Sequence, residues 1–192
     1  AATPRCGLQR YTFPASDSAY VILDLSHHYA TDSVKHTALS VLNDSVITGE
    51  RITKGWGDPG EKYWSNQKLY FAMQVSRPAD LISVYSEDES VSTGSASGTQ
   101  VKAVLHYRTA AGEPLSVKVG ISAVSTDNAL LNLHSELPGW DFDRVAEDAR
   151  RSWEEKLSRI RTEASDTEKR VFYTALYHSF CLLYTSPSPR DA

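Results

Sequence analysis

Cysteine is scarce in this sequence, as are long apolar runs and clusters of positive charge. The 192 residues include two cysteines, Cys6 and Cys181, so no disulfide framework is implied. No apolar stretch reaches the roughly 18 residues that a membrane-spanning helix requires. The net charge of −4, with no basic run, gives no indication of nucleic acid binding. The metal-binding patterns CxxC and HExxH are also absent.

The sequence also lacks a recognisable leader. It begins at Ala1 without an initiator methionine, a charged segment or an apolar core. We therefore expect that sequence has been lost upstream. Apolar residues make up 41% of the chain and charged residues 23%, which is typical of a soluble globular protein. The length suits one sizeable domain, or one domain and the start of another.

The first two thirds of the chain are rich in short β-type segments. Residues 100–107 show the pattern most clearly, because Val101, Ala103, Leu105 and Tyr107 fall on one face of an extended chain. Glycine, proline and small polar residues separate many of the segments. This spacing predicts a β-sandwich of antiparallel sheets. The expected strands lie at 6–13, 19–25, 37–42, 44–52, 68–75, 80–86, 99–108 and 115–124.

The apolar period changes near Asn128 from that of strands to that of helices. A short helix is expected at 128–137, followed by a long amphipathic helix at 142–160 capped by Asp141 or Asp143. Another helix is expected at 165–180. Strands followed by helices indicate an α+β protein or two domains. Because one or two helices cannot form a helical domain, we expect the chain to be cut after about Phe180.

Several long segments resemble one family. "ATPRCGLQRYTFP" (2–14), "WSNQKLYFAMQVSRP" (64–78), the segment from Gly120 to Ile160 and "FYTALYHS" (172–179) are similar, in the same order, to family 92 glycoside hydrolases, which are bacterial calcium-dependent exo-α-mannosidases. The resemblance implies an N-terminal β-sandwich joined by linker helices to an (α/α)6 barrel. That barrel would carry the catalytic carboxylates and most of the calcium site.

Mapped onto this chain, the resemblance gives four segments. Residues 1–126 would be the sandwich, truncated at its N-terminus, 127–164 the helical linker, and 165–180 the start of the barrel. Residues 181–192 depart from the family pattern and are expected to be non-native. The whole enzyme would be secreted or periplasmic. It would act on mannose-containing glycans, without nucleic acid or membrane partners, and would need the missing catalytic domain in cis.

The loop at 54–67 holds the candidate substrate-binding residues Trp56, Trp64, Asn66 and Gln67. Exposed aromatic rings on such a loop can stack on a sugar, and amide side chains can bind hydroxyl groups. From the residues alone, a loop whose tryptophan rings cover the loop itself is as well supported as a sugar-binding loop. The resemblance favours a functional role for Trp64, because family members wall the mannose subsite with aromatic residues of this domain; Trp56 follows less directly.

Other motifs are better explained without chemistry. Adjacent residues on a strand point to opposite faces, so His27 and His28 are expected to be a turn-edge pair with ordinary hydrogen bonds rather than to share a metal ion. His178 is expected to pack at an interface. The carboxylates at 86–90 lack calcium-loop spacing and predict a solvated loop, and "GSASG" (94–98) predicts a flexible turn.

An inverting glycosidase needs two carboxyl groups about 6.5–9.5 Å apart. No pair in residues 1–180 stands out for that role, so this chain alone is expected to be inactive, with the catalytic residues downstream. The alternative is a non-catalytic carbohydrate-binding β-sandwich module. A third possibility is a structural sandwich with no ligand.

Overall fold

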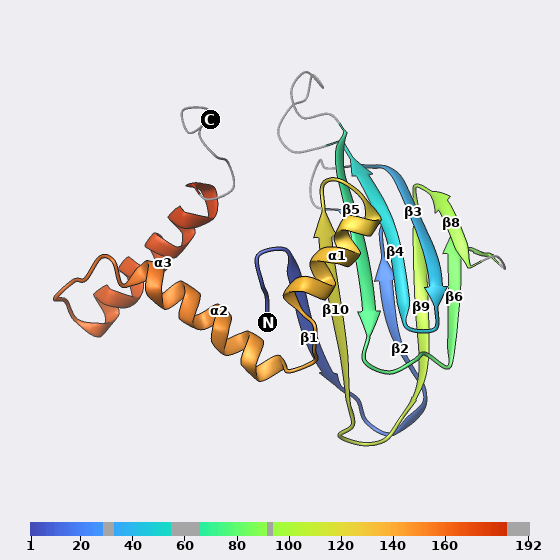
Figure 1. The fold of residues 1–192 in the computed structure, drawn as a ribbon, viewed down its shortest axis with the longest axis horizontal. Coiled ribbons are helices and arrows are strands. Elements are labelled where there is room, and N and C mark those ends of the chain that lie inside the picture. Colours follow the sequence, from blue (N-terminus) through green and yellow to red (C-terminus); the bar gives the residue numbers. More distant parts are fainter. Residues whose placement is uncertain (29–32, 55–65, 92–93, 184–192) are drawn as a thin grey trace. The chain divides into compact units, whose positions relative to one another are not determined.

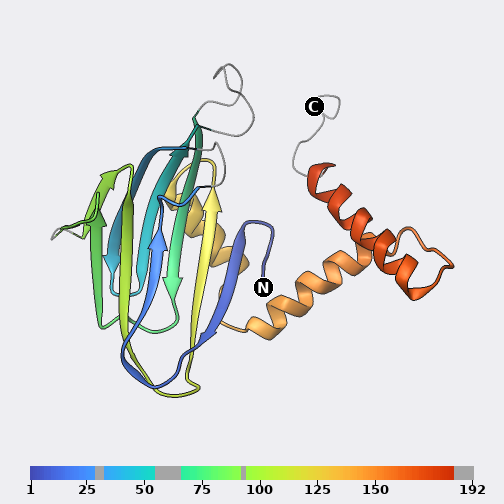
Figure 2. The ribbon, with the colours of Figure 1, turned by 180° about the vertical axis from the view of Figure 1, so that it is seen from behind.

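The computed structural model describes residues 1–28, 33–54, 66–91 and 94–183. The chain divides into two compact units, residues 1–145 and 146–192. The first unit contains two antiparallel sheets and a helix, and Figures 1 and 2 show it from opposite sides. The second contains most of α2 (Phe142–Leu157) together with α3 (Asp166–Leu183).

The larger sheet has six described strands in the order β1-β10-β5-β4-β3-β8. Its strands are β1 (Cys6–Thr12), β10 (Pro114–Ser122), β5 (Gln67–Val75), β4 (Val46–Thr53), β3 (Val34–Asn43) and β8 (Ser95–Gly98). The smaller sheet has the described strands β2 (Ser16–Asp24), β9 (Val101–Thr109), β6 (Leu81–Ser86) and β7 (Glu89–Val91), in that order. The sequence-based prediction of an antiparallel β-sandwich is therefore confirmed.

The main core lies between the two sheets. Val101, Ala103, Leu105 and Tyr107 of β9 are all buried there, as their alternation predicts. From the six-stranded sheet, Ile47, Phe71 and other apolar residues of β3, β4, β5 and β10 complete this core. Burial of these side chains is the main source of the stability of a sandwich of this kind.

Helix α1 (Thr126–Glu136) covers the other face of the six-stranded sheet, where it contacts β10, β5, β4 and β1 (Figure 1). Ala129, Leu133 and Leu137 pack there on Leu8 and Ala72. The helix approaches closely because β10 has no side chain at Gly120: a Cβ there would lie 2.6 Å from the Ala129 carbonyl oxygen. The fold thus has three layers, helix, large sheet and small sheet.

Helix ends follow the expected capping chemistry. The Asp141 carboxylate accepts a hydrogen bond of 3.0 Å from the backbone N–H of Arg144, which selects Asp141 over Asp143 as the cap of α2. The Ser125 hydroxyl caps α1 in the same way. At α3, Ser165 and Glu168 form a reciprocal capping box. α2 ends at Leu157, three residues before the expected limit, and α3 continues to Leu183.

Two local predictions were wrong. The segment 94–98 was expected to be a flexible turn, but Ser95–Gly98 form strand β8, which pairs with residues Thr37–Ser40 of β3. The segment 86–90 was expected to be a solvated loop: residues 87–90 are exposed, as expected, but only Glu87 and Asp88 form a turn, between β6 and β7. In both cases pairing with a longer neighbouring strand supplied order that the short polar segment does not encode by itself.

Candidate functional site at one end of the sandwich

The predicted site residues Asn66 and Gln67 lie where β5 begins, opposite the end of β4. Gln67 pairs with Thr53, and Asn66 precedes it with a left-handed backbone (φ 69°). The Asn66 side-chain oxygen accepts a hydrogen bond of 3.2 Å from the Lys35 amine. Trp56 and Trp64 lie outside the described residues. Of the four predicted site residues, the structure therefore brings together two, at the β4–β5 end of the sandwich.

Next to Gln67 the core-facing side of the large sheet becomes polar. Ile47 and Phe71 lie in the apolar core, and the register Arg51↔Leu69 and Thr53↔Gln67 places these four side chains on the same face, further along the same strands. A cavity of about 520 Å³ opens here, lined among the described residues by Arg51, Thr53, Gln67, Lys68 and Leu69. Such a cavity has the size of a small-molecule site.

Arg51 is the member of this cavity that the sequence analysis missed. Its Nε atom is buried and has no hydrogen-bond partner among the described residues. Its neighbour on β3, Thr37, is fully buried and donates its hydroxyl to the Gly98 carbonyl oxygen at 3.0 Å. The sequence did contain a signal for it. Ile47, Gly49 and Arg51 lie on the same face of β4, so a charged residue follows on the face that packs into the core.

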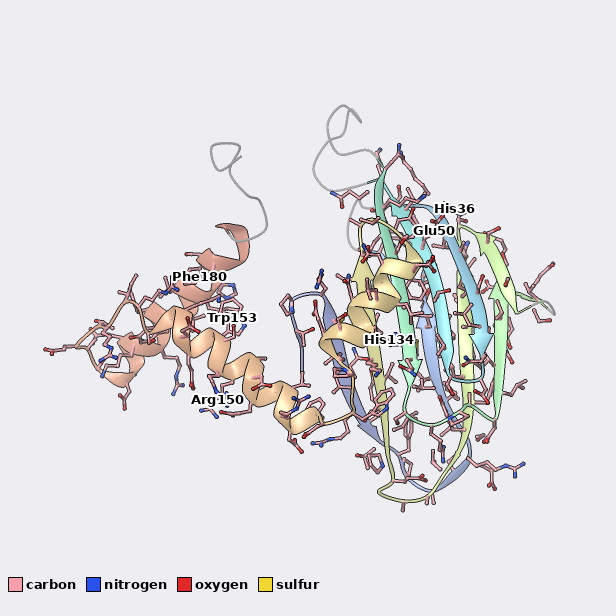
Figure 3. All side chains as sticks on the ribbon, viewed as in Figure 1. His36, Glu50, His134, Arg150, Trp153 and Phe180 are labelled. Carbon is pink, nitrogen blue, oxygen red and sulfur yellow. The ribbon has the colours of Figure 1, made fainter. Side chains whose placement is uncertain are left out.

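The opposite face of the same strand ends carries a charge cluster. Glu50 lies 3.4 Å from the Lys68 amine and 3.7 Å from the His36 ring (Figure 3). The Lys68 amine also lies 5.1 Å from the centre of the Tyr70 ring. Interaction with Tyr70 and with Glu50 raises the pKa of Lys68, so the lysine stays charged. This cluster offers paired charges rather than a free acid or base.

Two carboxylates of the segment 86–90 are already bonded to other groups of the sandwich. Glu87 accepts hydrogen bonds from the backbone N–H groups of Thr99 and Gln100, and Asp88 pairs with Lys102 at 3.0 Å. Bonding to Thr99 lowers the pKa of Glu87. Among the described residues, no group of three or more histidine, cysteine or acidic side chains could hold a metal ion. The described acidic side chains therefore do not gather into a calcium site by themselves.

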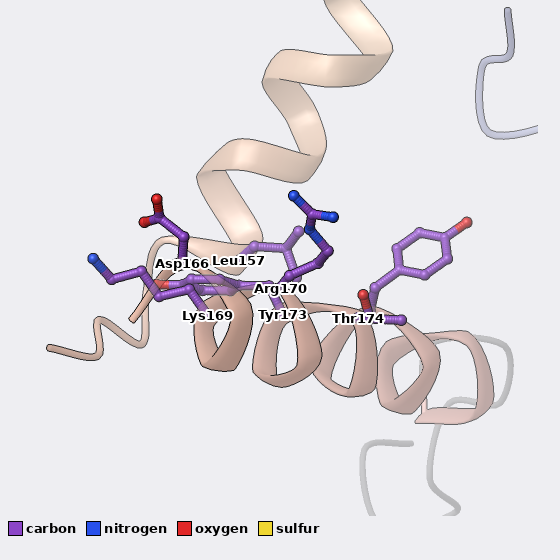
Figure 4. A pocket seen from close by; sticks show the side chains of 7 residues that line it. Leu157, Asp166, Lys169, Arg170, Tyr173 and Thr174 are labelled. Atoms are coloured by element: carbon purple, nitrogen blue, oxygen red, sulfur yellow. The ribbon is translucent and has the colours of Figure 1, made fainter. Parts of the chain in front are cut away.

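In the second unit, an open cavity of about 420 Å³ lies between α2 and α3 (Figure 4). Its described lining consists of Leu157, Asp166, Lys169, Arg170, Tyr173, Thr174 and Tyr177. Only one of these residues, Asp166, is an acid, whereas glycoside hydrolysis in most families uses two. His178 is exposed on α3, with its ring 5.6 Å from that of Tyr177. The described lining of this cavity therefore offers one carboxyl group rather than a pair.

The chain thus runs from a β-sandwich through a covering helix to two further helices, and models of two consecutive domains match it in the same order. The family models match the Glycosyl hydrolase family 92 N-terminal domain at residues 1–122 and the Glycosyl hydrolase family 92 catalytic domain at residues 128–186. The chain therefore belongs to glycosyl hydrolase family 92. The predicted family is confirmed.

Solved structures support the same assignment. The family GH92 alpha-mannosidase BT3965 from Bacteroides thetaiotaomicron is 32% identical, with a TM-score of 0.83 over 92% of this chain and 24% of its own, and a mannoimidazole complex of it matches equally well. The inverting mannosidase BT2199 of the same organism, 23% identical, shares the fold over 93% of this chain and 23% of its own (TM-score 0.78). The chain thus spans about a quarter of the length of these relatives.

A sequence relative gives a further comparison. An uncharacterized secreted glycosidase of the fungus Arthroderma benhamiae is 30% identical over an alignment of 135 residues, and the match covers 58% of this chain and 17% of the fungal protein. Among the described residues, no helix has both the length and the apolar character needed to cross a membrane.

Proposed function

We propose that this chain is part of a secreted exo-α-mannosidase that removes mannose from mannose-containing glycans with inversion of configuration. The observation that carries the proposal is that one chain matches both domains of family 92, while also being 32% identical to an α-mannosidase. The match at residues 128–186 is to a catalytic domain, which favours an enzyme over a carbohydrate-binding module. The secreted fungal relative supports export.

In this proposal the sandwich supplies one wall of the mannose pocket. Asn66 and Gln67 would bind sugar hydroxyl groups, and Trp64 and Trp56 would stack on the ring. The acid and base would come from the remainder of the catalytic domain, with a water molecule attacking the anomeric carbon in a single displacement. Calcium would be held by residues other than those described here. These 192 residues alone would therefore be inactive.

The test is hydrolysis of α-linked mannosides by the full-length enzyme, followed by NMR of the first sugar released. Inversion predicts that β-mannose appears first, and a chelator should reduce activity that added calcium restores. Initial release of α-mannose would contradict inversion, and no hydrolysis of any α-mannoside would contradict the proposed function. Activity in the 192-residue chain would contradict the assignment of the catalytic groups to another part of the enzyme.

A further inference from the structure

We propose that Arg51 is a specificity-determining residue whose buried Nε–H group hydrogen-bonds a hydroxyl of the bound mannoside. This inference rests on the proposed function and adds a residue to its binding site. Its starting point is the guanidinium Nε atom, which is buried without a hydrogen-bond partner among the described residues. A buried N–H donor with no acceptor costs free energy, so the folded protein retains such a group at a cost that a ligand can offset.

The surrounding described residues offer Arg51 no obvious acceptor. Leu69, directly opposite on β5, is apolar, and the Thr37 hydroxyl, which donates to the Gly98 carbonyl oxygen, accepts no hydrogen bond from Arg51 Nε. Arg51 instead lines the cavity of about 520 Å³ together with Thr53 and Gln67. Its free donor is therefore on the same side of the sheet as Gln67, a predicted site residue that also lines this cavity.

The chemistry of this cavity suits a neutral sugar better than an anion. Arg51 and the Gln67 amide are donors, the Gln67 carbonyl and the Thr53 hydroxyl can accept, and Leu69 adds apolar surface for a ring C–H face. The neighbouring cations are already partnered, because Lys68 pairs with Glu50 and Lys35 bonds to Asn66. A phosphate or carboxylate site normally gathers several available cations.

The experiment compares Arg51→Met and Arg51→Gln in the full-length enzyme. Methionine ends at about the position of the Arg51 Nε atom and has no donor, whereas glutamine places an N–H group there. We expect Arg51→Met to lower kcat/KM for an α-mannosyl disaccharide about ten-fold, the effect of one lost hydrogen bond to a polar substrate. Arg51→Gln should recover most of that loss, to within about three-fold of the wild type.

The matched control is Arg77→Met, because Arg77 follows the other end of β5 and its guanidinium donates to the Arg108 carbonyl oxygen at 2.8 Å. It should leave kcat/KM unchanged. If the wild type is active and Arg51→Met has the same kcat/KM, the role of Arg51 is overturned but the proposed function is not. If the wild type is inactive, the proposed function itself is overturned. Equal losses in both Arg51 variants, with a lowered melting temperature, would show a structural role. Inhibition by inorganic phosphate in wild type but not in Arg51→Met would show an anion site.

Discussion

At the scale of single residues, Tyr107 combines deep burial with an unsatisfied polar group. The side chain is 1% exposed, and its hydroxyl has no hydrogen-bond partner among the described residues. Burial raises its pKa to about 12. Tyr107→Phe removes the hydroxyl and keeps the ring, over which the Arg77 guanidinium lies 5.2 Å from the centre. We expect the free energy of unfolding to rise by about 1 kcal/mol.

Urea unfolding of the two proteins measures this difference. Tyr20→Phe is the control, because Tyr20 is 57% exposed on β2 and its hydroxyl is free to bond with water. The control should change the free energy of unfolding by less than about 0.5 kcal/mol. A clear loss of stability in Tyr107→Phe would mean that the hydroxyl has an acceptor in solution.

Gly120 is a residue at which a single methyl group should be costly. The added Cβ of Gly120→Ala would lie 2.6 Å from the Ala129 carbonyl oxygen and 3.2 Å from the Leu133 backbone nitrogen, so α1 would have to move off the sheet. We expect a loss of about 2–3 kcal/mol of unfolding free energy. Gly7→Ala is the matched control, because nothing lies within 4 Å of its added Cβ. Equal stabilities of the two variants in thermal melts would contradict close packing of α1.

At the scale of elements, the C-terminal end of α1 is tied to the start of the chain. Glu136 accepts hydrogen bonds from the Thr3 hydroxyl and from the Arg5 backbone N–H at 3.0 Å, and its other oxygen lies 2.6 Å from Arg5 Nε. Nearby, the buried Lys118 amine donates to the Leu137 carbonyl oxygen at 2.8 Å and lies 4.3 Å from the centre of the Trp140 ring. These contacts fix the end of α1 on the sheet.

The Glu136 contacts predict an acid dependence of stability. Burial opposes ionisation of Glu136, but the bonds from Thr3 and Arg5 outweigh it and lower its pKa below the ordinary 4.5. A lowered carboxyl pKa contributes stability that is fully present above 4.5 and is lost as the pH falls through the folded-state value. Glu136→Gln should therefore cost about 1–2 kcal/mol at pH 7 and much less in strong acid.

Urea unfolding at several pH values between 7 and the acid limit of folding, for wild type and Glu136→Gln, checks this prediction. The two curves of unfolding free energy against pH should converge in acid. Glu163→Gln is a suitable control, because Glu163 lies between α2 and α3, in the second unit. Parallel curves for wild type and Glu136→Gln would contradict a lowered pKa.

Much of the element order could be predicted from the sequence, because it rests on patterns within each segment. The alternation of residues 101–107 reflects the buried face of β9, and the apolar period of 142–157 predicts α2, although of its residues Val145 alone is buried. Strand β8 could not be found this way, since its order depends on pairing with β3. Arg51 and Lys118 interrupt otherwise apolar faces, and only the fold shows that one meets a cavity and the other a helix end.

At the scale of the whole molecule, the two units differ in how many apolar side chains they bury, since the buried apolar residues of the described chain all lie in the first. The first has two buried clusters, one between the sheets and one beneath α1. In the second, Trp153 and Tyr177 contact each other with ring centres 4.6 Å apart, but Ile160 is 50% exposed and Val171 66% exposed. The second unit thus presents apolar side chains typical of a surface that another part of a protein covers.

This difference predicts how the chain behaves alone. The 192-residue chain should be prone to aggregation and should bind the dye ANS, because Ile160, Val171 and Tyr177 of the second unit are exposed. A shorter chain of residues 1–149 keeps the first unit and the turn of α2 that holds Val145 on α1. It should be monodisperse in light scattering, bind several-fold less ANS and unfold cooperatively. As a control, Val171→Ser and Ile160→Ser in the 192-residue chain should lower ANS binding without changing the melting temperature of the sandwich. Aggregation of the shorter chain equal to that of the longer one would place the exposed apolar surface on the sandwich instead.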